Sequence, residues 1–227
     1  DQPVLEGIAG PVLGAEFATH FVIPVKQQDG LLRLVLVDAD AAGVDKRSAR
    51  LIDARATVLL GMKMVQGQWL DVGQEASLAQ MALDLAAAAM VADSAGVIEA
   101  AFTLTLDYLK QRVQFGKPLS AQQAVQHKMA EVFCDLQQLL ALAERLGLEI
   151  DSAPNGPWPT LAVAKSFVGR RGLRAVGQLV QLSGGIGVTE EYKLTHFYRR
   201  LHVAAEMFGA AEAQLARINT RDILLAA

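Results

Sequence analysis

The octet RVQFGKPL at residues 112–119 holds the residue types best suited to binding a flat ligand that carries phosphate. The guanidinium of Arg112 can pair with a diphosphate through its rigid fork of N–H donors, and the ring of Phe115 can stack on a planar group. Gly116 permits a sharp turn after a helix, and Pro118 prevents that helix from continuing. The octet therefore predicts either a ligand-binding corner or an ordinary connection between two helices with an exposed arginine.

A second candidate site is the glycine run QLSGGIG at residues 181–187. Glycines leave backbone N–H groups bare, which suits an oxygen-rich ligand that approaches closely. The spacing is not that of a dinucleotide fingerprint and no strand precedes it, which argues against a Rossmann site. The alternative interpretation is a glycine that ends a helix.

Other side chains capable of chemistry stand in contexts that favour structural roles. His127 and Glu131 share a helix face at i, i+4, but no further ligands lie nearby, so we expect no metal site. Cys134 stands among apolar residues, where a cysteine is usually unreactive, and no serine or cysteine has a nucleophile-elbow context. The remaining basic residues, expected on solvated helix faces, are Arg170, Arg171, Arg174, Arg199 and Arg200.

Composition excludes several classes of protein. The 227 residues are 52% apolar, which is enough for a sizeable core, and the net charge of −3 gives no basic field for nucleic acid. A single cysteine excludes an intrachain disulfide. No apolar run approaches the roughly 20 residues of a membrane span, so we expect a cytoplasmic protein without one. The start, DQP, has no initiator Met and no signal-peptide pattern, which favours a piece of a longer protein.

The pattern changes near residue 70 from β-branched and glycine-rich to helical. Residues 1–70 are expected to form two to four strands, and residues 71–227 four or five antiparallel helices. The expected strands are 17–25, 31–37, 56–60 and 63–65, with a hairpin turn at 27–30. The expected helices are 74–114, 121–148 capped by Ser120, 160–182 capped by Thr160, a shorter one starting at 189–191, and 206–225.

These segments resemble, in order and spacing, the C-terminal half of the acyl-CoA dehydrogenase family. Residues 108–119 resemble the signature Tyr-x-x-x-Arg-x-x-Phe-Gly-Lys-x-Leu, and residues 164–167 resemble an alanine–lysine segment. Residues 181–187 resemble the run Gln-x-x-Gly-Gly-x-Gly, which an arginine follows downstream, here Arg199. The resemblance implies a mainly α fold: a four-helix up-down bundle of acyl-CoA-dehydrogenase type, preceded by a small partial β-domain, the remnant of a middle domain.

The resemblance also implies that the chain helps to bind FAD and an acyl-CoA thioester. Arg112 matches the arginine that reaches the FAD diphosphate of a neighbouring subunit, and Asp84 matches an acidic residue that contacts the CoA portion. The other positions that match contacts to the cofactor are Gln114, Phe115, Gln122, Gln123, Gln181, Gly184 and Gly185.

The family reaction is α,β-dehydrogenation, in which a glutamate takes the α-proton and the flavin takes the β-hydride. The usual position of that glutamate falls on Phe208, and the alternative position falls on Ala86, beside Ala87 where the family has an arginine. None of these side chains accepts a proton. On a continuous helix Glu206 points about 200° away from Phe208, and Glu212 reaches the site only if the helix register differs.

Two functions follow as hypotheses. In the first, the chain is part of an FAD-dependent acyl-CoA dehydrogenase, inactive alone, whose partner subunit in a homo- or heteromeric dimer or tetramer supplies the base, and whose electrons pass to an electron-transfer flavoprotein. In the second, it is a non-catalytic helical assembly module that binds no flavin. A related flavoprotein chemistry on the same scaffold is a third possibility. Residues 1–227 by themselves are expected to retain little FAD.

Overall fold

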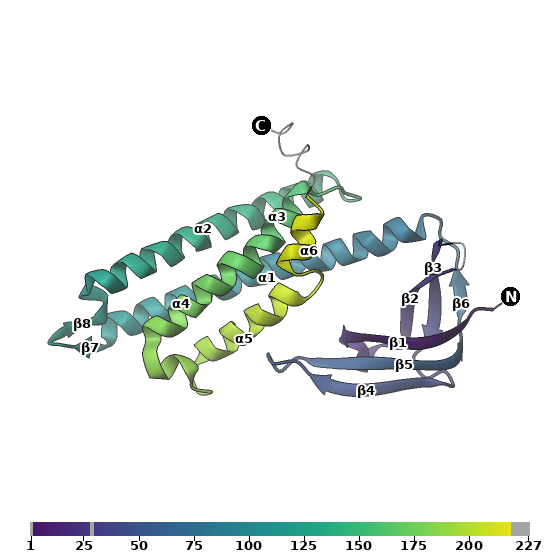
Figure 1. Ribbon diagram of the computed structural model, residues 1–227, viewed down its shortest axis with the longest axis horizontal. Helices are drawn as coiled ribbons and strands as arrows, with labels where there is room; N and C mark the ends of the chain where they lie inside the picture. The colour runs from purple at the N-terminus through teal and green to yellow at the C-terminus, as the bar shows by residue number, and fades with distance from the viewer. Residues whose placement is uncertain (1, 28–29, 219–227) are drawn as a thin grey trace. The chain divides into compact units, whose positions relative to one another are not determined.

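The computed structural model describes residues 2–27 and 30–218. They form two compact units, residues 1–82 and 83–227, of which the first is built of β-strands and the second of helices (Figure 1). The division falls inside the first long helix, α1 (Glu75–Gln111). The division expected after residue 70 instead follows the secondary structure, since the last strand of the β unit ends at Leu70.

The β unit consists of two three-stranded antiparallel sheets, in the orders β1-β5-β4 and β2-β3-β6. Its strands are β1 (Val4–Leu13), β2 (His20–Lys26), β3 (Leu32–Asp38), β4 (Val44–Arg50), β5 (Ala56–Gln66) and β6 (Gln68–Leu70). Phe21 of β2 shares one buried cluster with Val58 and Leu60 of β5, and Val35 and Val37 of β3 share another with Val65 of β5. Both sheets therefore contribute to each of the two clusters.

The expectation of two to four strands is wrong, because three strands lack the usual signals. β1 contains two glycines and Pro11, β4 has the charged sequence VDKRSAR, and β6 has only three residues. The two short strands expected at 56–60 and 63–65 are one strand, β5. The antiparallel pairing of β2 with β3 is confirmed, although the centre of the expected turn, residues 28–29, lies outside the described residues.

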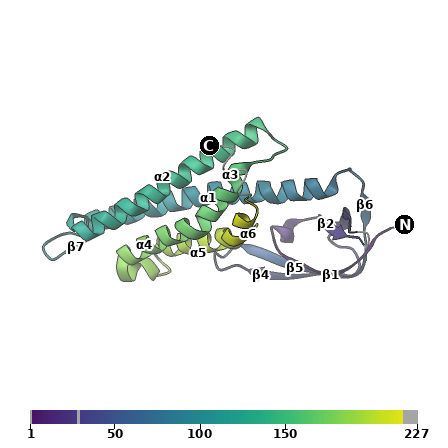
Figure 2. The same ribbon diagram turned by 45° about the horizontal axis from the view of Figure 1, so that its top comes forward.

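The helical unit consists of long helices that run antiparallel to one another and a short final helix (Figure 2). Beyond α1 it contains α2 (Gln123–Ser152), α3 (Pro159–Phe167), α4 (Leu173–Ser183), α5 (Lys193–Glu206) and α6 (Ala211–Ala216). A π-helical turn, Val168–Gly172, joins α3 and α4 into one rod. The expected mainly α fold, a four-helix bundle preceded by a small β region, is confirmed.

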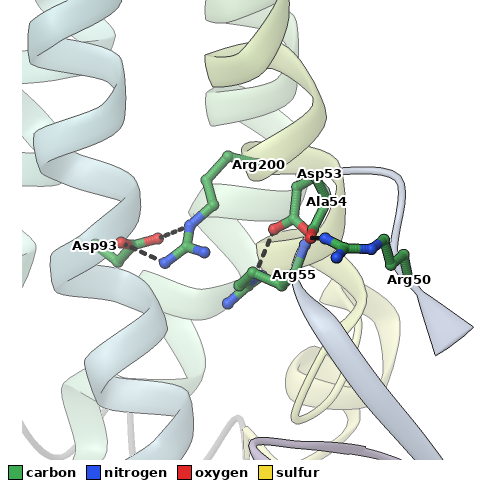
Figure 3. Close-up of polar contacts among 6 residues, drawn as sticks. All are labelled: Arg50, Asp53, Ala54, Arg55, Asp93 and Arg200. Carbon is green, nitrogen blue, oxygen red and sulfur yellow. Dashed lines mark hydrogen bonds and ion pairs between the residues drawn. The ribbon is translucent and has the colours of Figure 1, made fainter. Parts of the chain in front are cut away.

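Helix α1 packs along one stripe, since its buried residues recur every three or four positions, as at Val91, Ala95, Ile98 and Ala101. By length and composition it is also the one helix in the described part of the chain that is able to cross a membrane, a criterion that a bundle's core helix also meets. Asp93, near its middle, is held by Arg200 of α5 in a bidentate pair with both distances 2.9 Å (Figure 3).

The π-turn explains why residues 160–182 are not one regular helix. Gly169 lies against α6, since a Cβ added there would stand 3.0 Å from the Cβ of Ala211. Gly172 lies against α1, since its added Cβ would stand 3.2 Å from Cδ1 of Ile98. The widened turn and its glycines let two helices approach the rod closely.

Neither predicted serine or threonine cap is used, and both helices begin differently. A short 3₁₀ turn, Leu119–Ala121, precedes α2, so Ser120 lies outside that helix. At α3 the cap comes from another helix: Glu149 accepts hydrogen bonds from the backbone N–H of Thr160 at 3.0 Å and from its hydroxyl at 2.6 Å. A carboxylate at a helix N-terminus satisfies the free N–H groups and the helix dipole, which sequence-local capping rules do not detect.

A short connection between β4 and β5 is fixed by its own charged residues. Arg50 donates a hydrogen bond to the carbonyl of Ala54 at 3.1 Å, and Arg55 Nε lies 2.6 Å from Asp53 Oδ2 (Figure 3). Ala54 has a φ of 67°, a left-handed conformation that the turn imposes.

Candidate functional site

The octet 112–119 forms a two-stranded hairpin between α1 and α2, not a direct helical corner. Its strands are β7 (Val113–Gln114) and β8 (Lys117–Pro118), paired antiparallel. Phe115 and Gly116 occupy the turn with φ of 54° and 76°, as a type I′ hairpin turn requires. Gly116 therefore serves the hairpin and does not end α1. The Phe115 side chain is 92% exposed, so the turn presents an aromatic ring that this chain leaves uncovered.

Arg112 differs from the other arginines of the described helical unit. Within residues 83–218, every other arginine has a guanidinium nitrogen within 3.5 Å of a carboxylate oxygen; these are Arg145, Arg170, Arg171, Arg174, Arg199, Arg200 and Arg217. Arg112 is exposed and has no hydrogen bond or ion pair from its side chain to a described residue. Its guanidinium fork is thus available to a ligand.

The glycine run lies at the same end of the bundle as the hairpin. Along the facing helices α2 and α4, Asp135 pairs with Arg171 at 2.6 Å and Glu131 with Arg174 at 3.5 Å. This antiparallel register carries the start of α2 towards the end of α4. Figure 1 shows β7, β8 and the end of α4 at one end of the helical unit.

Contacts around Tyr192 tie the segment after the glycine run to the end of α1. Its hydroxyl lies 3.4 Å from the carbonyl oxygen of Leu104, and its ring centroid lies 6.2 Å from that of Tyr108. Burial raises the pKa of the Tyr192 phenol. Six of the predicted cofactor positions belong to three segments: Gln114 to the hairpin, Gln122 and Gln123 to the start of α2, and Gln181, Gly184 and Gly185 to the end of α4 and the turn after it.

The glycines of the run have different roles. Gly184 ends α4 with a φ of 65°, so the C-cap interpretation is confirmed for it. A Cβ added at Gly184 or Gly185 would meet nothing within 4 Å, whereas one at Gly187 would lie 2.8 Å from the carbonyl oxygen of Val180. Gly187 is therefore required by internal packing, while the backbone at Gly184 and Gly185 is open to a ligand.

Phe208 lies at the other end of α5, in a break that the sequence did not predict. The expected helix 206–225 is wrong within the described residues: α5 ends at Glu206, and α6 begins at Ala211. The expected helix start at 189–191 is wrong as well, because α5 begins at Lys193. We call residues 207–210 the 208 loop. Phe208 is partly buried in it, with a φ of 56°.

Neither neighbouring glutamate occupies the place of Phe208. Glu206 is exposed on the last turn of α5, and the side chain of Glu212 is 77% exposed and lies 3.3 Å from Arg170. Because the helix is broken between them, the expected angular relation of these residues on one helix does not apply.

Asp84, the predicted substrate contact, is held by an arginine that the sequence did not single out. Arg217 Nη1 and Nη2 lie 2.9 and 2.8 Å from the two oxygens of Asp84. This hydrogen bonding raises the pKa of Arg217. Ala86 is partly buried nearby on α1, and Ala87 is 1% exposed. The pair joins the first third of α1 to the segment that follows α6. Gln214 links that segment to Phe208, since it lies 3.2 Å from Arg217 and 2.9 Å from the carbonyl oxygen of Phe208.

Lys165 is the functional candidate that sequence reasoning missed. Its side chain is completely buried, and its Nζ donates hydrogen bonds to the carbonyls of Ala205 at 2.8 Å and Gly209 at 3.0 Å. Burial lowers the pKa of the ammonium from 10.5 to about 8, against a raising attraction from Glu206. The sequence placed Lys165 in residues 164–167, which resemble the family's alanine–lysine segment, but assigned it no role, because its partners lie 40 and 44 residues away.

This lowered pKa predicts a pH-dependent stability. Between pH 8 and 10.5 the unfolded state keeps the Lys165 proton while the folded state releases it, so the free energy of unfolding rises with pH across this window. Below about pH 8 the penalty for burying the charge is fully present. Urea unfolding of the wild type and of Lys165→Met at several pH values measures this. We expect the free energy of unfolding of the wild type, minus that of the variant, to increase between pH 8 and 10.5. A difference that does not change with pH would contradict the lowered pKa of Lys165.

The hairpin and the 208 loop lie at opposite ends of α5, whose 14 residues span about 21 Å at 1.5 Å per residue. One chain therefore does not bring Arg112 and Phe208 into contact. This separation suits an extended ligand or a site to which two subunits contribute.

No group of three or more His, Cys, Asp or Glu suited to a metal ion occurs among the described residues. Cys134 is exposed, although its sequence neighbours are apolar. Glu190 pairs with Arg199 at 2.5 Å, and this hydrogen bond lowers the pKa of the carboxyl.

Comparison with known proteins identifies the helical unit. Residues 76–222 match the family described as "Acyl-CoA dehydrogenase, C-terminal domain". The acyl-CoA dehydrogenase IpdE2 of Mycolicibacterium smegmatis is 26% identical over 222 residues, which cover 96% of this chain and 67% of that protein. The chain spans between 37% and 67% of the first three curated relatives that it matches.

Solved structures give the same fold. The structure described as "Tcur3481-Tcur3483 steroid ACAD G363A variant" is 29% identical, with a TM-score of 0.83, over 100% of this chain and 60% of that one. The ChsE4-ChsE5 complex from Mycobacterium tuberculosis is 22% identical, with a TM-score of 0.85, over 97% of this chain and 60% of that one. At that lower identity the likeness establishes the fold alone.

Proposed function

Because the chain belongs to the acyl-CoA dehydrogenase family, we propose that it is part of an FAD-dependent enzyme that removes hydrogen from the α and β carbons of an acyl-CoA thioester. We further propose that this chain lends its flavin-binding corner to a partner subunit, which supplies the catalytic base. The observation that carries this proposal is Arg112, the unpaired arginine of the described helical unit.

The residues at the hairpin fit a flavin dinucleotide. Arg112 offers parallel N–H donors to the diphosphate, and the exposed ring of Phe115 offers a face to a planar group. Gly184 and Gly185 leave room for close approach, since an added Cβ at either meets no atom within 4 Å. The amides of Gln122, Gln123 and Gln181 lie at this end as donors and acceptors for the adenosine part. FAD, when bound, would accept the hydride from the β-carbon of the substrate.

Position 208 is the reason for proposing a partner. Phenylalanine there has no group that accepts a proton, and Glu206 and Glu212 point to solvent. Since the 208 loop and the hairpin are separated by the length of α5, a chain without a base still retains a complete flavin-binding corner. That corner then serves a neighbouring subunit.

An assembly through the helical unit is supported by apolar side chains that this chain leaves exposed. They lie on α1, α2 and α3, and include Leu83 at 51%, Phe133 at 47%, Leu148 at 64% and Val163 at 41%. Contiguous exposed apolar surface marks association sites, and we propose that these side chains are covered in an assembly. We propose a dimer or tetramer, homomeric or mixed, with an electron-transfer flavoprotein as the redox partner.

Asp84 is proposed to contact the CoA portion of the substrate. Arg217 holds both oxygens of its carboxylate at 2.8 and 2.9 Å, and this bidentate pair fixes the direction of the carboxylate.

The flavin content of the full-length protein, co-purified with its partner subunit, tests the proposal. We expect bound flavin, seen as absorption in the visible range, and bleaching of that absorption on addition of acyl-CoA. A full-length assembly without flavin, and without flavin uptake on addition of FAD, would instead favour a non-catalytic helical module. Phe208 is the observation that keeps this second function open.

A further inference from the structure

The 208 loop has irregular backbone, yet side chains from two other helices hold it. Lys165 of α3 donates to the carbonyls of Ala205 and Gly209, at 2.8 and 3.0 Å. Gln214 of α6 donates to the carbonyl of Phe208 at 2.9 Å. The hydroxyl of Ser166, next to Lys165, lies 3.1 Å from the carbonyl oxygen of Ala211 and 2.7 Å from that of Ala162, which share its one proton. Donors from α3 and α6 thus bracket the loop on both sides.

The side chains that supply these donors are buried. Lys165 is 0% exposed, Gln214 2% and Ser166 6%. Burying an ammonium group is costly unless its hydrogen bonds are made, and here the acceptors are backbone carbonyls at the end of α5. That end carries the negative pole of the helix dipole, which stabilises a cation. Lys165 of α3 therefore caps the C-terminal end of α5, and its second hydrogen bond fixes Gly209 in the 208 loop.

The loop they hold is in a conformation that a free chain avoids. Phe208 has a φ of 56°, which is rare for a bulky side chain and strains the backbone. Gly209 follows with a φ of 100°, and a Cβ there would lie 2.5 Å from Nε2 of Gln214. Such a conformation persists only where surrounding contacts impose it.

We propose that Lys165 and Gln214 are positioning residues, which fix the 208 loop and so fix the direction in which the side chain at position 208 points. This inference rests on the proposed function, because position 208 is where the family places its base. In this proposal the backbone of the 208 loop keeps the conformation that would orient a base at position 208, although the residue there is phenylalanine.

Hydrogen exchange of the native full-length assembly tests the positioning role. Met207 N–H donates to Val203 O and Gln214 N–H to Ala210 O, both at 3.0 Å, so these amides report on the two ends of the loop. Lys165→Met keeps most of the volume and removes the donors. We expect exchange at both amides to accelerate by about tenfold or more through local opening, while amides in the middle of α2 change by less than about threefold.

The control is Lys128→Met, since Lys128 is exposed on α2; it should leave the loop amides unchanged. Uniform acceleration throughout the helical unit, or no acceleration at the loop, would overturn the proposal. If Lys165→Met does not fold, Gln214→Met provides the same test, because it removes the donor to the Phe208 carbonyl at similar volume.

Turnover separates this proposal from the proposed function. In an assembly carrying Phe208→Glu, Lys165→Met is expected to lower kcat by about tenfold to a hundredfold with little change in KM, as misplacement of a reacting group does. If Phe208→Glu itself gains no activity, the proposed reaction at this site fails, while the exchange result still decides whether Lys165 fixes the loop.

Discussion

Phe208→Glu is expected to create dehydrogenase activity at this chain's own site. The variant places a carboxylate where the 208 loop, held by Lys165 and Gln214, keeps residue 208 in a left-handed conformation. Glutamate is no more strained at a φ of 56° than the phenylalanine that it replaces. A positioned general base contributes about 10²- to 10⁴-fold to rate, so we expect a gain of at least a hundredfold in acyl-CoA-dependent reduction of an artificial electron acceptor.

The matched control is Phe208→Gln, whose neutral amide has nearly the size of the glutamate carboxylate but is not a base. Activity of the glutamate variant should also increase with pH as its carboxyl ionises, because only the carboxylate accepts the α-proton. Equal rates for the glutamate and glutamine variants would show that the site of this chain lacks more than a base.

Arg112→Ala is expected to weaken FAD binding by about 10- to 100-fold. Hydrogen bonds to a charged group contribute about 1.5–3 kcal/mol, and each 1.4 kcal/mol corresponds to about tenfold in affinity. Arg112 has no carboxylate partner within the described residues, so its removal should leave the folded chain intact and affect only the ligand. FAD affinity, measured by flavin fluorescence during titration of the apo assembly, gives the magnitude.

Two variants sharpen this experiment. Arg112→Lys should fall between wild type and alanine, because an ammonium group keeps the charge but loses the planar fork. Arg174→Ala removes an exposed arginine that lies 3.5 Å from Glu131, and it should not change FAD affinity. In a mixed assembly, Arg112→Ala in this chain should reduce turnover at the partner's site. Unchanged turnover there at FAD concentrations below saturation would exclude the shared corner.

The sequence pattern alone predicted those elements whose bounds depend on neighbouring residues in the chain. A proline-free apolar repeat of three and four residues predicted α1 within a few residues of its observed bounds, and the glycine run correctly ended α4 at Ser183. Failures occurred where a cap or a break depends on distant residues. Glu149 caps α3 in place of Thr160, and the 208 loop interrupts an otherwise helical pattern.

By itself, the sequence determined the family signature at residues 112–119 and 181–187 and the absence of an ionisable group at Phe208, since these depend only on residue identity and spacing. The tertiary structure decided which of these groups is available. Arg112 stands out because the other arginines of the described helical unit are paired. Lys165 gained its role from carbonyls 40 and 44 residues away. Pairing and burial depend on which helices meet, and no local pattern in the chain specifies those contacts.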